Sequence, residues 1–189
     1  MQIRLVIVPL LSALIFGAGI GARCVQAATL QQLPNDQLID QATEIVRGTV
    51  NYCNYLYRPP MIYTVCEVDV KERFKGDAAA KVQVAIPGGV AAGYRQTIEG
   101  VPSLTVKSEY LFFLWQGKNG LKQIMGLSQG VLNLSKDASG NLVLTRAKIE
   151  DRMVNAEGQP VTDQAVSVKL TDFEATIRAR VNSTKAGRQ

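Results

Sequence analysis

The segment from Ile62 to Phe74 constrains the possible folds of this chain more than any other. Its side chains alternate between a mostly apolar set and a set that contains charged residues, a pattern typical of a β-strand with one face in a protein core. One set consists of Ile62, Thr64, Cys66, Val68, Val70 and Phe74, and the other contains Glu67, Asp69, Lys71 and Arg73. We therefore predict a long strand whose first set, including Cys66, points inward.

Further strands are predicted on both sides of this segment. Residues 44–50 are rich in β-branched side chains, and residues 81–86 alternate again. Residues 109–116 are a continuous apolar run of strand length, which predicts a central strand buried on both faces. The remaining candidates are 123–127 and a hairpin of 131–135 with 142–146 around the polar turn 136–141.

Two helices are expected outside the run of strands. Residues 34–42 are typical of a short helix with Asn35 or Asp36 at its cap. Residues 171–174 have the spacing of a capping box and predict a C-terminal helix, followed by a frayed tail from about residue 182. Five or six strands flanked by two helices predict a mainly β fold. The most economical arrangement is a partly closed, OB-like β-barrel with a short N-terminal helix and a C-terminal helix.

The amino terminus has the pattern of a secretory signal peptide over residues 1–27. A single charge at Arg4 precedes an uncharged apolar stretch, and Ala27 completes a small-x-small cleavage site. The alternative is a retained membrane anchor, against which Pro9 and three glycines of the stretch argue. Cys24 also suggests a lipoprotein signal, but a bulky, charged arginine precedes it.

Cleavage after residue 27 predicts a single β-rich domain of residues 28–189 that is periplasmic or secreted. No other segment is long and apolar enough to span a membrane, so no stable membrane insertion is expected after cleavage. The chain has 21 Lys and Arg against 16 Asp and Glu; the signal removes two arginines and leaves 19 against 16. A dispersed net charge of +3 gives no support to nucleic-acid binding.

Two cysteines, Cys53 and Cys66, remain in that domain. In an oxidising compartment they predict a disulfide. Their separation of thirteen positions around residues 54–61 fits a bridge between neighbouring antiparallel strands. The alternative is two independent buried thiols.

The chain contains no histidine. Catalysis by Ser-His-Asp or Cys-His groups is therefore excluded, as is every metal site that needs an imidazole. A pair of carboxylates could still hydrolyse a glycoside, but nothing in the sequence singles out such a pair. We predict no catalytic residue, no metal and no cofactor.

Three parts of the chain resemble a known family of exported domains. They are residues 42–50, residues 63–65 leading to 74–76, and residues 109–114. These stretches resemble the first strands of netrin-like domains and tissue inhibitors of metalloproteinases, which are OB barrels. The Pro-Gly-Gly at 87–89 and the Gly-Leu-x-Gln-Gly at 126–130 are also similar to segments of uncharacterised exported bacterial proteins. The inhibitors bind the protease zinc with an amino-terminal cysteine, whereas the predicted mature chain begins at Ala28, so the resemblance implies the fold and not inhibition.

The candidate ligand-binding residues are Tyr52, Tyr55, Tyr57, Arg58 and Tyr63. They belong to a predicted loop between the first two strands, where OB-like folds often bind ligands. Tyrosine rings have flat apolar faces and polar tips that suit stacking on sugars, bases or peptides. The alternative is a loop that is packed by its own rings and held by the disulfide.

Two glycine-rich segments favour structural interpretations. Residues 87–93 lack the helix that follows a phosphate-binding loop, so a flexible connection between strands is expected. Residues 126–130 predict a bulge or a close approach of two backbones. Ser128 within them has no histidine to activate it as a nucleophile.

These observations favour an exported, non-enzymatic binding module that recognises an unknown exported protein through strand edges and loops. The alternative is a barrel that binds a saccharide or another small molecule through the tyrosine-rich loop 52–63. A third hypothesis, an acid-base hydrolase with two carboxylates, has no candidate pair.

Overall fold

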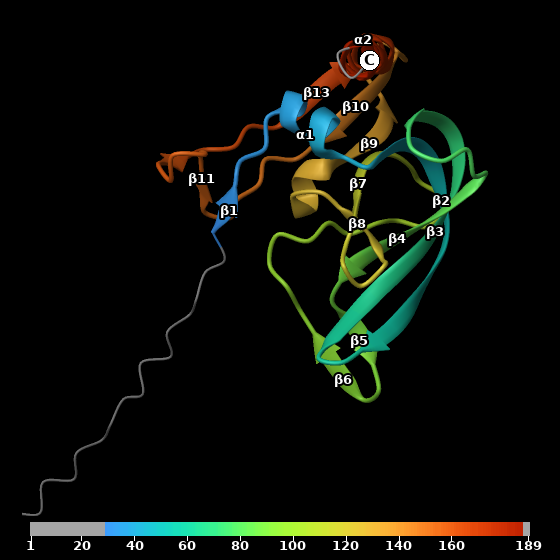
Figure 1. The fold of residues 1–189 in the computed structure, drawn as a ribbon, viewed down its shortest axis with the longest axis vertical. Helices are drawn as coiled ribbons and strands as arrows, with labels where there is room; N and C mark the ends of the chain where they lie inside the picture. Colours follow the sequence, from blue (N-terminus) through green and yellow to red (C-terminus); the bar gives the residue numbers. More distant parts are fainter. Residues whose placement is uncertain (1–28, 187–189) are drawn as a thin grey trace, which may run out of the picture.

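The computed structural model describes residues 29–186 (Figure 1). The predicted signal peptide and its cleavage site after Ala27 lie outside these residues. Two long antiparallel strands, β2 (Glu44–Arg58) and β3 (Met61–Lys75), pair with each other and dominate the fold. The described chain is mainly β, as predicted.

Five strands, β2 and β3 among them, form a partly closed barrel. β3 pairs with β4 (Lys81–Pro87), and β2 pairs on its other side with β7 (Glu109–Gln116). β8 (Lys122–Ile124) pairs with both β7 and β4 and so bridges the two sides of the barrel. The parallel contact of β4 with β8 has a single registered pair, Ala85 with Gln123, so the barrel is weakest there. This arrangement confirms the predicted OB-like barrel.

The sheet continues beyond β7 through three further strands. They are β9 (Val131–Lys136), β10 (Leu142–Arg146) and β13 (Val166–Lys169). β7 therefore lies in the middle of the sheet, and its residues 110–114 are buried, as predicted for the central strand.

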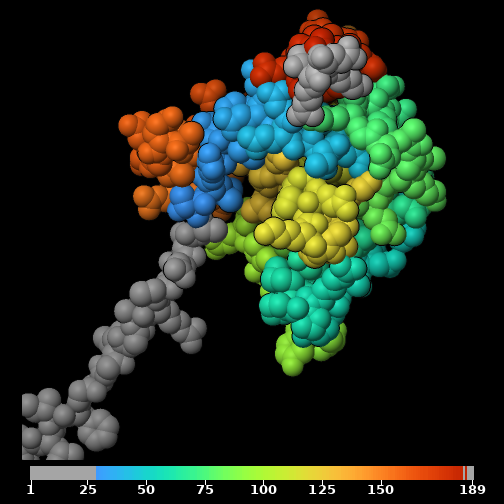
Figure 2. Space-filling model, viewed as in Figure 1, coloured from blue at the N-terminus to red at the C-terminus, as the bar shows by residue number. Residues whose placement is uncertain are grey.

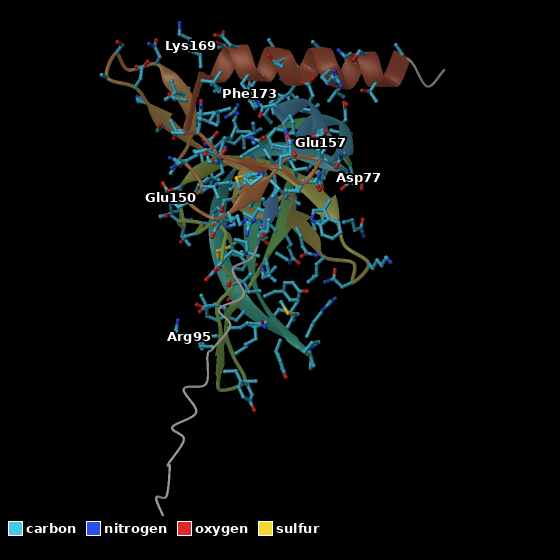
Figure 3. All side chains as sticks on the ribbon, turned by 90° about the vertical axis from the view of Figure 1, so that its left-hand side faces the viewer. Asp77, Arg95, Glu150, Glu157, Lys169 and Phe173 are labelled. Carbon is cyan, nitrogen blue, oxygen red and sulfur yellow. A yellow bond between two sulfur atoms is a disulfide. The ribbon has the colours of Figure 1, made fainter. Side chains whose placement is uncertain are left out.

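Two helices, α1 (Asn35–Gln41) and α2 (Leu170–Ala186), cover one face of this sheet (Figures 1 and 3). No side chain caps α1, so the cap predicted at Asn35 or Asp36 is wrong. α2 continues past residue 182, where we predicted a frayed tail. Among the described residues, neither helix is long and apolar enough to cross a lipid bilayer.

Short elements complete the chain. They are β1 (Leu30–Gln31), β5 (Gly89–Ala91), β6 (Tyr94–Gln96), the 3-10 helix η1 (Leu127–Gly130), β11 (Met153–Val154) and β12 (Pro160–Val161). β5 and β6 form a hairpin that lies beside the outer end of β2 and β3, at the lower end of the molecule in Figures 1 and 2.

Apolar side chains form one cluster on each face of the sheet. The helix-side core contains Leu111 and Phe113 of β7, together with residues of both helices. The barrel core contains Tyr110, Phe112 and Leu114 of the same strand. Because alternate residues of β7 enter different cores, the apolar run in its sequence is continuous.

One face assignment made from the sequence is wrong. Phe74 packs in the helix-side core, whereas Cys66 packs in the barrel core. The pairing of β2 with β3 shifts near Gly48, where β3 has an extra residue that reverses the direction of the following side chains. The same shift turns Arg73 to the barrel side, where it forms an ion pair with buried Glu44.

A buried ion pair attaches the loop after β10 to the sheet. Arg146 Nη1 and Nη2 donate to the two carboxylate oxygens of Asp163 at 2.5 and 3.1 Å, and the Ile149 N–H donates to Oδ2 at 2.8 Å. Burial opposes ionisation of Asp163, but these hydrogen bonds outweigh it and lower the pKa of the carboxyl below its ordinary value.

Asp163→Asn is expected to lower the free energy of unfolding by about 3 kcal/mol near neutral pH, because the largely covered Arg146 side chain, 13% exposed, loses its counter-charge. Since the folded-state pKa of Asp163 is lowered, its contribution is present above the ordinary aspartate pKa of about 4 and is lost as the pH falls through the lower folded value. Urea unfolding at about pH 7 and about pH 3 should show a smaller difference between the two proteins in acid. Glu150→Gln, at an exposed carboxylate, is the control, and an equal loss there would contradict this account.

Candidate functional site

The tyrosine-rich segment forms the outer end of the β2–β3 hairpin. Strand pairing continues to the last residue before the turn, so the loop predicted for residues 52–63 is wrong. Tyr52, Tyr55 and Tyr57 are exposed, at 44%, 59% and 43% of their surfaces. Each of these three tyrosines therefore keeps a large part of its surface open to solvent.

The other two predicted binding residues have structural contacts. Tyr63 is buried, and its hydroxyl accepts a hydrogen bond from Asn119 Nδ2 at 3.1 Å. Arg58 Nη1 donates to the carbonyl of Asn119 at 2.7 Å. Both contacts hold the hairpin against the turn after β7. Because Tyr52 and Tyr55 are three positions apart in a strand, they lie on opposite faces, and the five predicted residues do not form one site.

Cys53 and Cys66 lie directly opposite each other on β2 and β3 and form a disulfide, as predicted. Their Cα atoms are 4.0 Å apart. Cys66 is buried in the barrel core and Cys53 is half-buried. The bridge therefore joins the two strands at the base of the tyrosine-rich segment.

β2 has a neighbouring strand on only one side along its outer half. β7 pairs with β2 over residues 44–49, and Val50 then bonds to the backbone of residues 107 and 108. Beyond Val50, no backbone hydrogen bond reaches β2 from this side within residues 29–186. We call residues 52–58 on this side the free edge of β2.

Three residues direct their backbone groups toward the free edge. The short Cα separation marks Cys53 and Cys66 as a non-hydrogen-bonded pair of the antiparallel ladder. The N–H and C=O of Cys53 therefore point away from β3, and by alternation so do those of Tyr55 and Tyr57. These groups are left without a strand partner in the described chain.

The β5–β6 hairpin is fastened to β3 through the glycine-rich segment 87–93. Gly88 N–H donates to the Ile62 carbonyl at 2.7 Å, and Ile62 N–H donates to Gln96 Oε1 at 2.8 Å. Thr64 Oγ1 donates to the Gly88 carbonyl at 3.0 Å. The segment that we predicted to be a flexible loop is therefore the start of a hydrogen-bonded hairpin.

Gly89 allows a close contact between this hairpin and Tyr55. Its φ of +135° lies in a region that L side chains rarely adopt. A Cβ atom there would lie 2.7 Å from Tyr55 Cδ1 and 2.9 Å from Thr64 Oγ1. The Tyr55 ring therefore lies against backbone at a position that only glycine fits.

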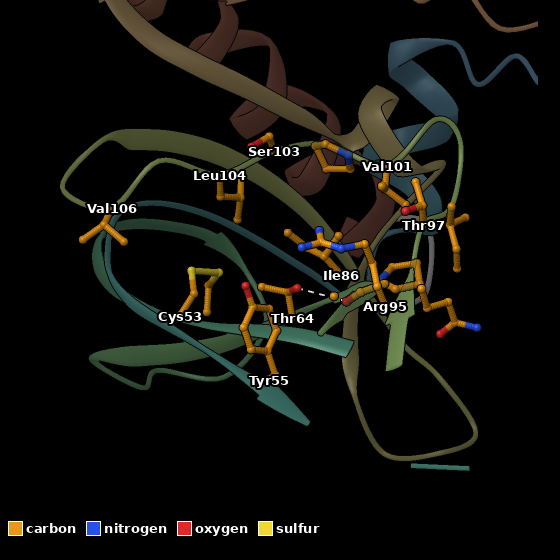
Figure 4. Close-up of a pocket in the computed structure, with 17 residues that line it drawn as sticks. Cys53, Tyr55, Thr64, Ile86, Arg95, Thr97, Val101, Ser103, Leu104 and Val106 are labelled. Atoms are coloured by element: carbon orange, nitrogen blue, oxygen red, sulfur yellow. Dashed lines mark hydrogen bonds between the residues drawn. A yellow bond between two sulfur atoms is a disulfide. The ribbon is translucent and has the colours of Figure 1, made fainter. Parts of the chain in front are cut away.

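A cavity of about 430 Å³ opens between the two hairpins and the segment 97–106 (Figure 4). Its lining includes the disulfide, Tyr55, Ile86, Val101, Leu104 and Val106, and the hydroxyl-bearing Thr97 and Ser103. Arg95 extends over it from β6, and no carboxylate lines it. We call this space the tyrosine cavity.

A second cavity of about 550 Å³ lies behind residues 101–104, against residues 145–151. The segment 126–130 stands beside it. A Cβ on Gly130 would lie 2.2 Å from the Met125 carbonyl oxygen, which confirms the close backbone approach predicted there. Ser128 Oγ donates to the Gly100 carbonyl at 2.7 Å, so this hydroxyl has a structural contact.

No cluster of three or more potential metal-ligating side chains occurs among the described residues. The chain matches no protein-family model and no curated protein.

Sequence reasoning missed Arg95 and the free edge of β2. A two-residue turn at Ala92 and Gly93, both with positive φ, separates two short extended runs and could have predicted the β5–β6 hairpin. No pattern within residues 44–58 shows which part of β2 lacks a second neighbouring strand, because that depends on where β7 begins, about 50 residues later in the chain.

Removing the disulfide by replacing Cys53 and Cys66 together with alanine is expected to lower the free energy of unfolding by about 2–4 kcal/mol, chiefly because the unfolded chain gains freedom. Thermal unfolding followed by circular dichroism would measure the loss. A reductant should destabilise the original protein similarly and leave the double variant unchanged. Equal melting temperatures for the two oxidised proteins would refute the expectation.

Gly89→Ala is expected to destabilise the fold by about 1–3 kcal/mol, because the new Cβ meets Tyr55 and Thr64 in a glycine-only conformation. Gly93→Ala is the matched control: its φ of +78° carries strain, but no atom lies within 4 Å of the added Cβ. Chemical unfolding of both variants should show the larger loss at Gly89. The reverse order would disprove the close contact.

Proposed function

We propose that this protein is an exported, non-enzymatic binding module that recognises a protein partner by pairing with one of the partner's strands. The free edge of β2 carries the proposal. Its outward N–H and C=O groups at Cys53, Tyr55 and Tyr57 can form an antiparallel or parallel ladder with an extended segment. Backbone bonds of this kind provide affinity, and side-chain contacts add specificity.

The composition of the free edge supports this use. Proteins commonly protect exposed strand edges with charged residues or proline. Residues 52–57 of the free edge contain neither; the one charge, on Arg58, stands at its end before the two prolines of the turn and is bonded to the Asn119 carbonyl. Their exposed tyrosines lie on both faces of the strand, and tyrosine is among the residues that contribute most to the binding energy of protein interfaces.

The saccharide alternative has less geometric support. A sugar-stacking site needs rings that face the same ligand, and of the predicted tyrosines only Tyr55 and Tyr57 share a face, since Tyr52 lies on the other face and Tyr63 is buried. A protein strand at the free edge would contact Tyr52, Tyr55 and Tyr57 from both faces at once. We therefore favour the protein partner.

The proposal is tested by crosslinked capture from the native exported fraction, followed by amide hydrogen exchange on the captured complex. The amides of Cys53, Tyr55 and Tyr57 are expected to become protected, because each would donate to the partner strand. A complex in which these three amides exchange as in the free protein would overturn edge pairing. Failure to capture a stoichiometric protein would argue against the binding module itself.

Tyr57→Lys adds a charge to the free edge and is expected to weaken capture about tenfold or more. Tyr57 does not line the tyrosine cavity, so the variant reports on the edge alone. Tyr94→Lys is the matched control, because Tyr94 is also exposed but lies on β6. Equal weakening by both variants would indicate a general effect of charge and would contradict the proposal.

A further inference from the structure

We infer that the tyrosine cavity is a binding site for a small carboxylic acid with an apolar tail. The inference does not depend on the free edge, because it rests on the side chains that line the cavity, whereas the free edge consists of the N–H and C=O groups on the unpaired side of β2. A volume of about 430 Å³ falls within the range of small-molecule sites.

Arg95 supplies the recognition of charge. It lies on β6 and extends over the cavity (Figure 4). It forms no ion pair with any of the residues that the structure describes. Since no Asp or Glu lines the cavity, an anionic group entering it would meet a guanidinium that has no competing partner and can bind a carboxylate through two parallel hydrogen bonds.

Two hydroxyl groups can complete the polar part of the site. Thr97 and Ser103 line the cavity, and neither side chain donates a hydrogen bond elsewhere within residues 29–186. Both belong to the segment that forms the wall opposite β2 and β3. They are suitable donors to a carboxylate oxygen or to a water molecule bound beside it.

The rest of the wall is apolar and fits the tail. Val101 and Leu104 pack against the barrel core from one side, and the disulfide and the Tyr55 ring face them from the other. A polar ligand such as a free sugar would leave its hydroxyls unpaired against these groups, at a cost in free energy. An alkyl or aromatic tail would gain by burial there.

The test uses the isotope-labelled protein and two probes of equal length, octanoate and octanol, followed by amide chemical shifts. Octanoate is expected to shift the amides of Thr97, Ser103 and Leu104 saturably, and octanol to bind at least about tenfold more weakly. Absence of binding, shifts confined to other surfaces, or equal affinity for the two probes would each overturn the inference.

Arg95→Gln is expected to lower the affinity for octanoate about tenfold and to leave that for octanol unchanged. Arg95 is exposed and forms no ion pair in the described chain, so the variant should fold, and the dispersion of its amide spectrum checks this. Arg95→Lys keeps the charge and should retain part of the affinity. Lys118→Gln is the control from the same end of the molecule, since Lys118 is exposed in the turn after β7 and does not line the cavity; an equal loss there would also overturn the inference.

Discussion

The fold depends on the pairing of β2 with β3. Both proposed binding sites depend on a second fact: β7 pairs with only the inner part of β2 and leaves the outer part without a neighbour on that side. β2 and β3 both run for 15 residues. β7 begins at Glu109, opposite Thr49, and pairs with only the first six residues of β2, so the inner part of β2 is a central strand and its outer part is an edge. The inner part of β2 therefore contributes side chains to the barrel core, while its outer part has backbone groups without a strand partner on one side.

The outer half stays ordered because other contacts replace the missing strand. The disulfide joins β2 to β3 a few residues beyond the part of β2 that pairs with β7. Asn119, in the turn after β7, bonds to both Arg58 and Tyr63. The β5–β6 hairpin is fastened to β3 through Ile62 and Thr64. A two-stranded hairpin alone is marginally stable in water. These attachments therefore hold the free edge and the walls of the tyrosine cavity in place.

The elements that sequence predicts well are those whose signal is local. Alternation marks β3, the continuous apolar run marks β7, and two cysteines at a hairpin spacing mark the disulfide. The failures have non-local causes. The face of Phe74 depends on an extra residue of β3 near Gly48. The extension of β2 through the tyrosines depends on its partner β3, because the asparagines and the two prolines around the strand-favouring tyrosines indicate a loop. The tyrosine cavity is less predictable still, because three segments far apart in the chain enclose it.

Tyr55 belongs to both the free edge of β2 and the wall of the tyrosine cavity. Its backbone N–H and C=O face the free edge, while its ring lies against Gly89 and forms part of the cavity wall. A partner strand that fixes the backbone of Tyr55 also restricts the position of the ring, and a ligand that fixes the ring restricts the backbone. In the proposed arrangement the two binding events are therefore linked, and by thermodynamic reciprocity each must change the affinity of the other by the same factor.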